Sequence, residues 1–164
     1  MSYILKLLKN NFLLTLLSFM KSKNWVNRQK NDQFVKKAKQ LGYINRASFK
    51  LEEIEQKYKI IENSKEILEL GSSPGGWTQV ILNCNPKTNI TCFDLLDMKI
   101  NNRYITFYRE DFLKYNFINL KNKFDLVLSD VAPNTTGHQS TDHLRISQLI
   151  YEIIQRLEII LKNK

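Results

Sequence analysis

A glycine-rich segment, residues 69–77, constrains the fold of this chain more than any other feature. It holds three of the chain's five glycines within six positions. It follows the apolar run Glu66–Leu70, which is typical of a strand, and precedes residues 78–82, which are typical of a helix start. Glycines at such a turn let the backbone bend sharply and approach a ligand closely. In an open α/β sheet, nucleotide-like ligands bind at a turn of this kind.

The rest of the chain alternates between strand-like and helix-like segments. Leu149, Ile153, Leu157 and Ile160, for example, mark one face of a long helix. Strands that alternate with helices predict βαβ units, so the expected class is α/β, with a Rossmann-like, mostly parallel sheet flanked by helices. We expect further strands at 91–94, 105–108 and 124–129, and helices at 32–41, 48–58 and 141–161.

The spacing within the glycine-rich segment excludes two common nucleotide motifs. It differs from the G-x-G-x-x-G of dinucleotide sites, and no Gly-Lys-Ser/Thr follows as in a P-loop. Asp94 lies at the end of the next strand, 23 residues after Gly71, where a carboxylate can accept both hydroxyls of an adenosyl ribose. Because the glycines and the acid occur in this register, we interpret them as a ligand site in preference to a plain glycine turn.

Two further acids follow later strands. Asp111 ends the predicted third strand, where it can accept from an adenine amino group while the ring of Phe112 packs beside it. Asp is common at strand ends, so this assignment has no support of its own. Asp130 ends the fourth strand. Three acids in one crevice predict a positively charged ligand, such as a sulfonium methyl donor, whereas the pyrophosphate of NAD would be repelled.

The chain is strongly basic. Its 25 Lys and Arg against 16 Asp and Glu give a net charge of +9. This excess favours a polyanionic partner, either nucleic acid or an anionic membrane surface, although the codon usage of an AT-rich genome also explains part of it. Lys36, Lys37 and Arg46 are candidate RNA phosphate contacts, and the alternative is a solvated helix face. The two cysteines lack metal-ligand spacing, so we expect no metal site.

The first 30 residues form a basic extension that precedes a single domain, residues 31–164. No acid occurs in the first 31 residues, and the uncharged run at 10–20 is shorter than the roughly 20 apolar residues of a transmembrane helix. Two interpretations remain open: a targeting segment, or a helix that docks on the domain. An organellar location, mitochondrion or plastid, is slightly favoured over the cytoplasm.

Five runs in order resemble the FtsJ/RrmJ family of ribosomal RNA large-subunit 2′-O-ribose methyltransferases. They are residues 45–51, 71–77, 93–96, 111–112 and 129–134, and the resemblance extends from 24 to 164. It implies S-adenosyl-L-methionine as cofactor and a ribose 2′-hydroxyl, on a uridine of organellar large-subunit rRNA, as methyl acceptor. Ribosomal RNA or the large-subunit particle is the implied partner, and we expect a monomer. The bacterial and mitochondrial branch matches better than the tRNA branch.

The resemblance also implies roles for individual residues. Gly75 and Trp77 would lie against the methionine end of the cofactor. Asp130 would sit between cofactor and substrate, in a Lys-Asp-Lys-Glu constellation that begins with Lys50; without the resemblance, Lys50 would be interpreted as a solvated helix lysine. The predicted catalytic residues are thus Lys50 and Asp130, and the predicted cofactor-binding residues are Gly71, Pro74, Gly75, Gly76, Trp77, Asp94 (ribose), Asp111 (adenine), Phe112 and Asp130.

The chain departs from the family at its end. Relatives continue after the last helix into strands that carry the second lysine and the glutamate, and neither Lys162 nor Lys164 occupies the expected position. We therefore expect the C-terminal strands to be missing, either because the natural protein is longer or because this chain is truncated. Residues 124–129 would then expose an apolar strand edge, so we expect the 164-residue chain to be poorly soluble and inactive.

Two other functions remain open at this point. One is a non-catalytic RNA-binding module that retains the cofactor pocket but lacks the family's base. The other is a tRNA 2′-O-methyltransferase of the same family.

Overall fold

The computed structural model describes residues 13–15, 33–133 and 136–162. Among these residues, five parallel strands form one sheet in the order β1-β5-β2-β3-β4. The parallel sheet with helices between its strands confirms the predicted α/β class. The strands are β1 (Leu13–Thr15), β2 (Glu66–Leu70), β3 (Asn89–Phe93), β4 (Ile105–Tyr108) and β5 (Leu126–Ser129).

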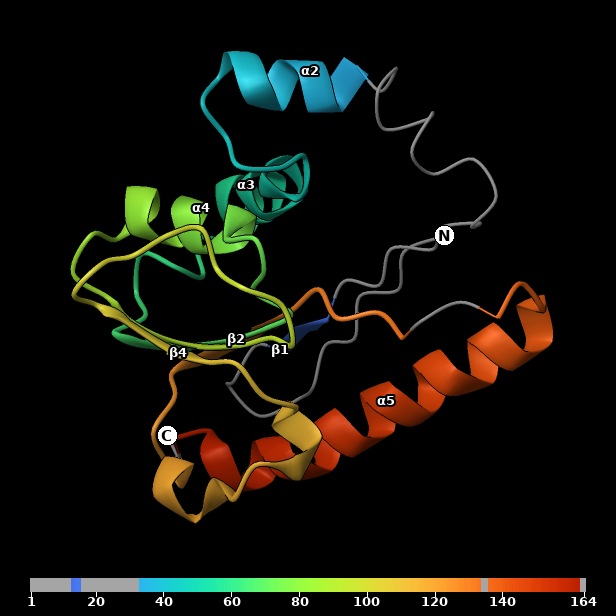
Figure 1. Cartoon of the computed structure of the whole chain (residues 1–164). Helices are drawn as coiled ribbons and strands as arrows, with labels where there is room; N and C mark the ends of the chain where they lie inside the picture. The colour runs from blue at the N-terminus through green and yellow to red at the C-terminus, as the bar shows by residue number, and fades with distance from the viewer. Residues whose placement is uncertain (1–12, 16–32, 134–135, 163–164) are drawn as a thin grey trace.

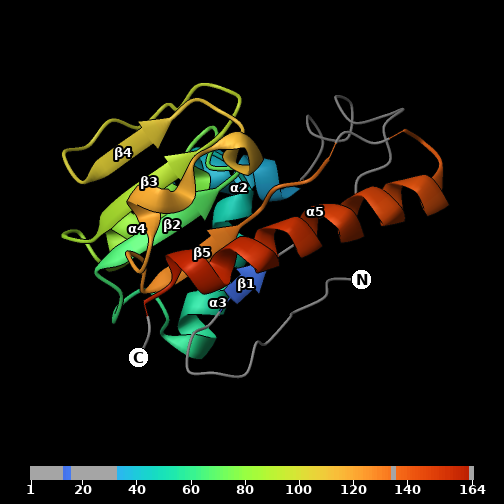
Figure 2. The same ribbon diagram turned by 90° about the horizontal axis from the view of Figure 1, so that it is seen from below.

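Helices cover both faces of the sheet (Figure 1). On one face lie α3 and α4, with α2 outside α3; the other face is crossed by α5 and two short 3-10 helices, η2 and η3 (Figure 2). No helix in the described part of the chain is long and apolar enough to span a membrane. The helices are α2 (Gln33–Gln40), α3 (Ala47–Tyr58), α4 (Gly76–Cys84), η2 (Phe112–Lys114), η3 (Phe117–Leu120) and α5 (Gln139–Ile160).

The central strand β2 is buried on both faces because successive side chains of a strand point to opposite sides. Ile67 packs into the apolar cluster beneath α3 and α4, whereas Leu68 packs into the cluster beneath α5. The α5 stripe expected from the sequence is in place: Ile153, Leu157 and Ile160 are all buried in the second cluster. The two clusters hold the sheet rigidly between its helical layers.

One predicted strand end is wrong. The strand β4 ends at Tyr108, so Asp111 lies three residues beyond it. There its carboxylate accepts the Leu113 N–H at 3.0 Å and caps η2. Short polar side chains are preferred at helix caps because they satisfy N–H groups that the helix leaves unpaired. Phe112, the next residue, is buried with its ring 5.4 Å from that of Phe93.

The outer edge of β5 is paired, which corrects the expectation of a bare edge. The strand β1 runs parallel to β5, in a register that joins Leu13 to Val127 and Thr15 to Ser129. At the other end of β5, Leu161 forms a parallel bridge with Phe124. The paired segment belongs to the predicted N-terminal extension, where residues 13–15 form a strand and no docking helix. The rest of that extension lies outside the described residues.

Truncation of the buried α5 stripe should destabilise the fold. Ile153 is 2% exposed, so Ile153→Ala should lower the free energy of unfolding by about 2–5 kcal/mol through lost burial and a residual cavity. Ile159 on the same helix is 46% exposed, and Ile159→Ala should change stability by less than about 0.5 kcal/mol. Denaturant titration measures both. Equal effects of the two substitutions would contradict the packing of α5 on the sheet.

Candidate active site

The glycine-rich loop leaves the sheet at its centre, since β2 ends between β3 and β5. The Gly71 N–H donates to Phe93 O at 2.9 Å, on the β3 side. On the β5 side, the Asp130 N–H donates to Leu70 O at 3.1 Å. The start of the loop and Asp130 therefore lie side by side at the carboxyl edge of the sheet, where open α/β folds bind ligands.

Two glycines fix how the loop enters α4. Gly75 is the N-cap residue and has a φ of +114°, a conformation that residues with a side chain rarely adopt. At Gly76, a Cβ atom would lie 2.0 Å from Asn45 Oδ1. Only a glycine therefore leaves room for Asn45, which precedes α3. The same Asn45 oxygen accepts the Ala47 N–H at 3.1 Å, so the loop and the start of α3 are locked together.

Asp94 is bound to the loop directly. Its Oδ2 accepts the Ser73 N–H and its Oδ1 accepts the Leu96 N–H, each at 2.8 Å. A further backbone bond, from the Lys99 N–H to Pro74 O at 3.1 Å, joins the loop to the segment after Asp94. Each carboxylate oxygen has a second lone pair and can still accept from a ligand hydroxyl. The predicted acid and the predicted loop thus form one unit.

Lys50 and Asp130 meet at this edge although 80 residues separate them. Lys50 Nζ lies 3.0 Å from Asp130 Oδ1, and the side chains are 27% and 22% exposed. Burial raises the pKa of Asp130, and the ammonium group of Lys50 opposes that shift. The first turn of α3 positions Lys50: Ala47 O accepts from Trp77 Nε1 at 2.9 Å, and Ser48 Oγ donates to Gly76 O at 3.1 Å.

Trp77 and Asp111 have surroundings that sequence reasoning did not foresee. The indole of Trp77 is 3% exposed and belongs to the core beneath α3 and α4, so only its backbone faces a ligand in the loop. The side-chain partners of Asp111 are the Leu113 N–H and, at 3.9 Å, Lys114 Nζ. Neither partner belongs to the loop or to the Lys50–Asp130 pair. The structure brings Lys50, Asp94 and Asp130 to the loop more closely than Asp111.

The three predicted RNA contacts lie on the helices nearest to Lys50. Lys36 and Lys37 are exposed on α2, and Lys37 Nζ is 5.4 Å from the ring centroid of Phe49. Arg46 is the N-cap residue of α3 and precedes Lys50 by four residues, a spacing that places side chains on one side of a helix. These cations can therefore hold a polyanion that reaches Lys50.

Glu69 and two serines at this edge were missed. Glu69 is 1% exposed, and Thr78 Oγ1 donates to it at 2.6 Å. The hydroxyls of Ser72 and Ser129 are buried and have no hydrogen-bond partner among the described residues. A signal for Glu69 existed in the sequence, namely an acid inside a strand that is otherwise apolar. No signal marked the serines, since an unsatisfied hydroxyl depends on tertiary contacts.

These residues fit a polar adenosyl ligand. Buried hydroxyls normally have partners, and two without one, beside a loop with the helix N-terminus behind it, indicate a place for polar ligand atoms. No group of three or more His, Cys, Asp or Glu within the described residues could hold a metal ion. The acids at this edge therefore fit an organic cation better than a metal.

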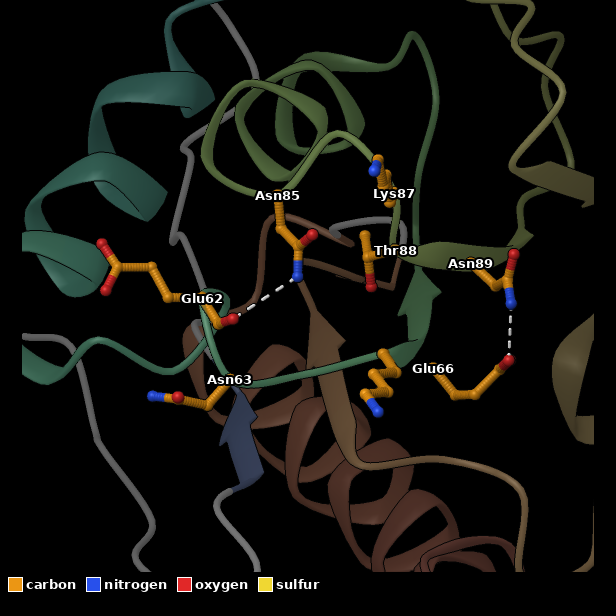
Figure 3. A pocket seen from close by; sticks show the side chains of 8 residues that line it. Glu62, Asn63, Glu66, Asn85, Lys87, Thr88 and Asn89 are labelled. Atoms are coloured by element: carbon orange, nitrogen blue, oxygen red, sulfur yellow. Dashed lines mark hydrogen bonds between the residues drawn. The ribbon is translucent and has the colours of Figure 1, made fainter.

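A cavity of about 560 Å³ lies at the opposite, amino-terminal edge of the sheet (Figure 3). Its polar side chains are largely bound to neighbours: Asn85 Nδ2 donates to Ser64 O at 2.9 Å, and Asn89 Nδ2 donates to Glu66 Oε1 at 2.6 Å. Ligands of open parallel sheets bind at the carboxyl ends of the strands. We therefore place the candidate active site at the glycine-rich loop and not in this cavity.

Comparison with known proteins gives a consistent answer. The ribosomal RNA large subunit methyltransferase E of Zymomonas mobilis is 40% identical over 136 residues, which cover 80% of this chain and 61% of that protein. The protein of the same name from Rickettsia bellii is 40% identical over 134 residues, covering 76% and 59%. The chain thus spans about three fifths of the length of these relatives.

A solved structure is also similar. A crystal structure described as that of a ribosomal RNA methyltransferase from Plasmodium falciparum superposes with a TM-score of 0.64 at 29% identity, covering 73% of each chain. Residues 43–163 match the family model described as FtsJ-like methyltransferase. Because this match includes most of the chain and every element of the loop region, the protein belongs to the FtsJ-like methyltransferase family.

Proposed function

We propose that this protein is an S-adenosylmethionine-dependent RNA methyltransferase that methylates a ribose 2′-hydroxyl of large-subunit rRNA, most readily on a uridine. The observation that carries the proposal is the Lys50–Asp130 pair, held beside a glycine-rich loop that Asp94 braces. The names of the relatives, which are ribosomal RNA methyltransferases, support the rRNA substrate. The acid-free first 31 residues support an organellar location, and we propose a monomer.

The cofactor would lie across the loop. Asp94 would accept the ribose hydroxyls with its remaining lone pairs, and the backbone from Gly75 to Trp77 would line the methionine end. Asp111 and Phe112 would contact the adenine from the segment after β4. When bound, S-adenosylmethionine supplies an electrophilic methyl group on a sulfonium centre. The carboxylates of Asp94 and Asp130 would stabilise that positive charge.

The Lys50–Asp130 pair would orient the acceptor. An ammonium group donates hydrogen bonds and cannot accept a proton, so in this pair Asp130 is the group that accepts from a ribose hydroxyl. Lys50 would fix the carboxylate and hold the adjacent RNA phosphate. Most of the rate enhancement would come from alignment of the hydroxyl with the methyl group, which replaces a bimolecular encounter with a positioned one.

Asp94 can be tested through cofactor binding. Asp94→Ala should weaken S-adenosylmethionine binding by about 1.5–3 kcal/mol, the range for hydrogen bonds to a charged group. The matched control is Asp97→Ala, because Asp97 is 74% exposed and is paired with Arg109 outside the loop. Isothermal titration calorimetry measures both dissociation constants. If Asp94→Ala binds the cofactor as tightly as the parent chain, Asp94 does not hold the ribose.

The reaction can be tested with labelled S-adenosylmethionine and large-subunit rRNA. Mass spectrometry of the digested nucleosides should detect 2′-O-methyluridine. Lys50→Met and Asp130→Asn should each slow transfer by about 100-fold or more, because proton handling and orientation at the hydroxyl are lost. Lys57→Met, on the exposed side of the same helix, should be neutral.

The alternatives give different products in this assay. A methylated base would refute ribose chemistry, and transfer to tRNA alone would favour the tRNA alternative. Cofactor binding without transfer to either RNA would favour the non-catalytic RNA-binding module.

The RNA surface can be tested by salt dependence. RNA affinity should fall steeply with salt, because each neutralised phosphate releases counterions. The double substitution of Lys36 and Lys37 by Gln should reduce the slope of log affinity against log salt by roughly 1.5–2. The control is the corresponding Gln substitution of Lys65 and Lys87, which line the cavity at the opposite edge. A flat salt response in the parent chain would contradict electrostatic RNA binding.

A further inference from the structure

Glu69 is an ionisable side chain at the centre of the sheet that the proposed reaction does not use. It is the fourth residue of β2 and is 1% exposed, between the buried Leu68 and Leu70. A carboxyl group at such a position loses its water, and no printed salt bridge supplies it with a cation. Buried polar groups that are fully hydrogen-bonded tend to impose one specific geometry on their surroundings.

The partner of Glu69 is the first turn of α4. Thr78 donates to the carboxyl through its Oγ1, at 2.6 Å, and also through its backbone N–H. Thr78 is the third residue of α4, and N–H groups in the first turn of a helix lack partners within the helix. The N-cap residue, Gly75, provides no side-chain cap. Glu69 therefore caps α4 from the strand that precedes it.

This bridge is the inner support of the glycine-rich loop. From the outside, the loop is held by bonds to β3 and its following segment: Gly71 to Phe93, Ser73 to Asp94 and Lys99 to Pro74. From the inside, the Glu69–Thr78 bond closes the segment from the last turn of the strand to the first turn of the helix. Without it, only the outer bonds would fix the distance between β2 and α4.

We propose that Glu69 is a positioning residue, whose carboxyl group, bridged to Thr78, sets the spacing between β2 and α4 and thereby holds the loop in its ligand-binding shape. The part of this inference that concerns the ligand rests on the proposed function, whereas the loop geometry does not. Glu69 touches neither the loop surface nor the reacting atoms, so it acts through the backbone of residues 71–77.

The surroundings of Glu69 give the bridge a dependence on pH. Burial raises the pKa of Glu69 to about 8 against the hydrogen bonds from Thr78 and Cys92, and the charge of Asp130 adds to the increase. The titratable groups that face it are Cys92 on β3, whose Sγ is 3.8 Å from Oε2, and Asp130 after β5, with Lys50 paired to Asp130. Burial also raises the pKa of the Cys92 thiol, so Cys92 stays neutral here.

The bridge is tested with variants that remove or keep its hydrogen bonds. Glu69→Met and Thr78→Val remove it with little change in shape, and each should weaken S-adenosylhomocysteine binding by about tenfold in calorimetry. Glu69→Gln and Thr78→Ser keep an acceptor or a hydroxyl and should bind within about twofold of the parent chain at pH 7. The control is Glu55→Met, because Glu55 is also buried but caps the turn after α3 through the N–H groups of Ile61 and Glu62.

A second measurement is independent of the ligand. Amide hydrogen exchange of residues 71–78 should be faster in Glu69→Met than in the parent chain, and Glu55→Met should leave those amides unchanged. Folded Glu69→Met and Thr78→Val variants with parental affinity and parental exchange would overturn the proposal. If the parent chain does not bind S-adenosylhomocysteine, the proposed function fails, and the exchange data alone still decide whether Glu69 positions the loop.

The pH dependence supplies a third measurement. A carboxyl whose pKa is raised from the ordinary 4.5 to about 8 stabilises the fold in its protonated form, fully below pH 4.5 and progressively less as pH rises through 8. The Tm of the parent chain should therefore fall relative to that of Glu69→Gln between pH 5 and 8.5, by about 5 °C. Parallel Tm curves for the two proteins would mean that Glu69 titrates as an exposed acid and forms no buried bridge.

Discussion

The parallel pairing of β2 with β3 on one side and β5 on the other is the constraint on which the rest of the structure depends. The register places Leu70 beside both Phe93 and Ser129. The residues that follow these three strand ends must then emerge together, which is why Gly71, Asp94 and Asp130 share one edge. A slip of one residue would turn every side chain of β2 to the opposite face and would place Glu69 beneath α5.

The sequence predicted those parts of the site that are local or that follow directly from strand order. The loop, the strand before it and Asp94 all lie within one βαβ unit, so their proximity follows from the pattern alone. The Lys50–Asp130 contact has a different origin, because nothing in the spacing of a lysine on a helix predicts which strand end it will reach. That pair was expected only from the family resemblance, and the structure confirms that the two side chains meet.

The predictions that failed depended on contacts outside the local pattern. Asp111 follows a strand as expected, but the chain bends into η2 before it, and the carboxylate satisfies that short helix. The edge of β5 was expected to be bare, since pairing with a segment more than one hundred residues earlier leaves no trace in hydrophobic periodicity. Both failures concern partners chosen by tertiary structure, which single-sequence patterns do not encode.

The pairing of β1 with β5 also has a consequence for how the fold forms. Leu13 and Val127 are more than one hundred residues apart, whereas β2 and β3 are joined by a single helix. Closing so long a loop has a large entropic cost, and contacts of high sequence separation slow folding. The four strands from β5 to β4 can assemble around their two apolar clusters first. The N-terminal strand would then dock last, so it would be the first strand to detach in partial unfolding.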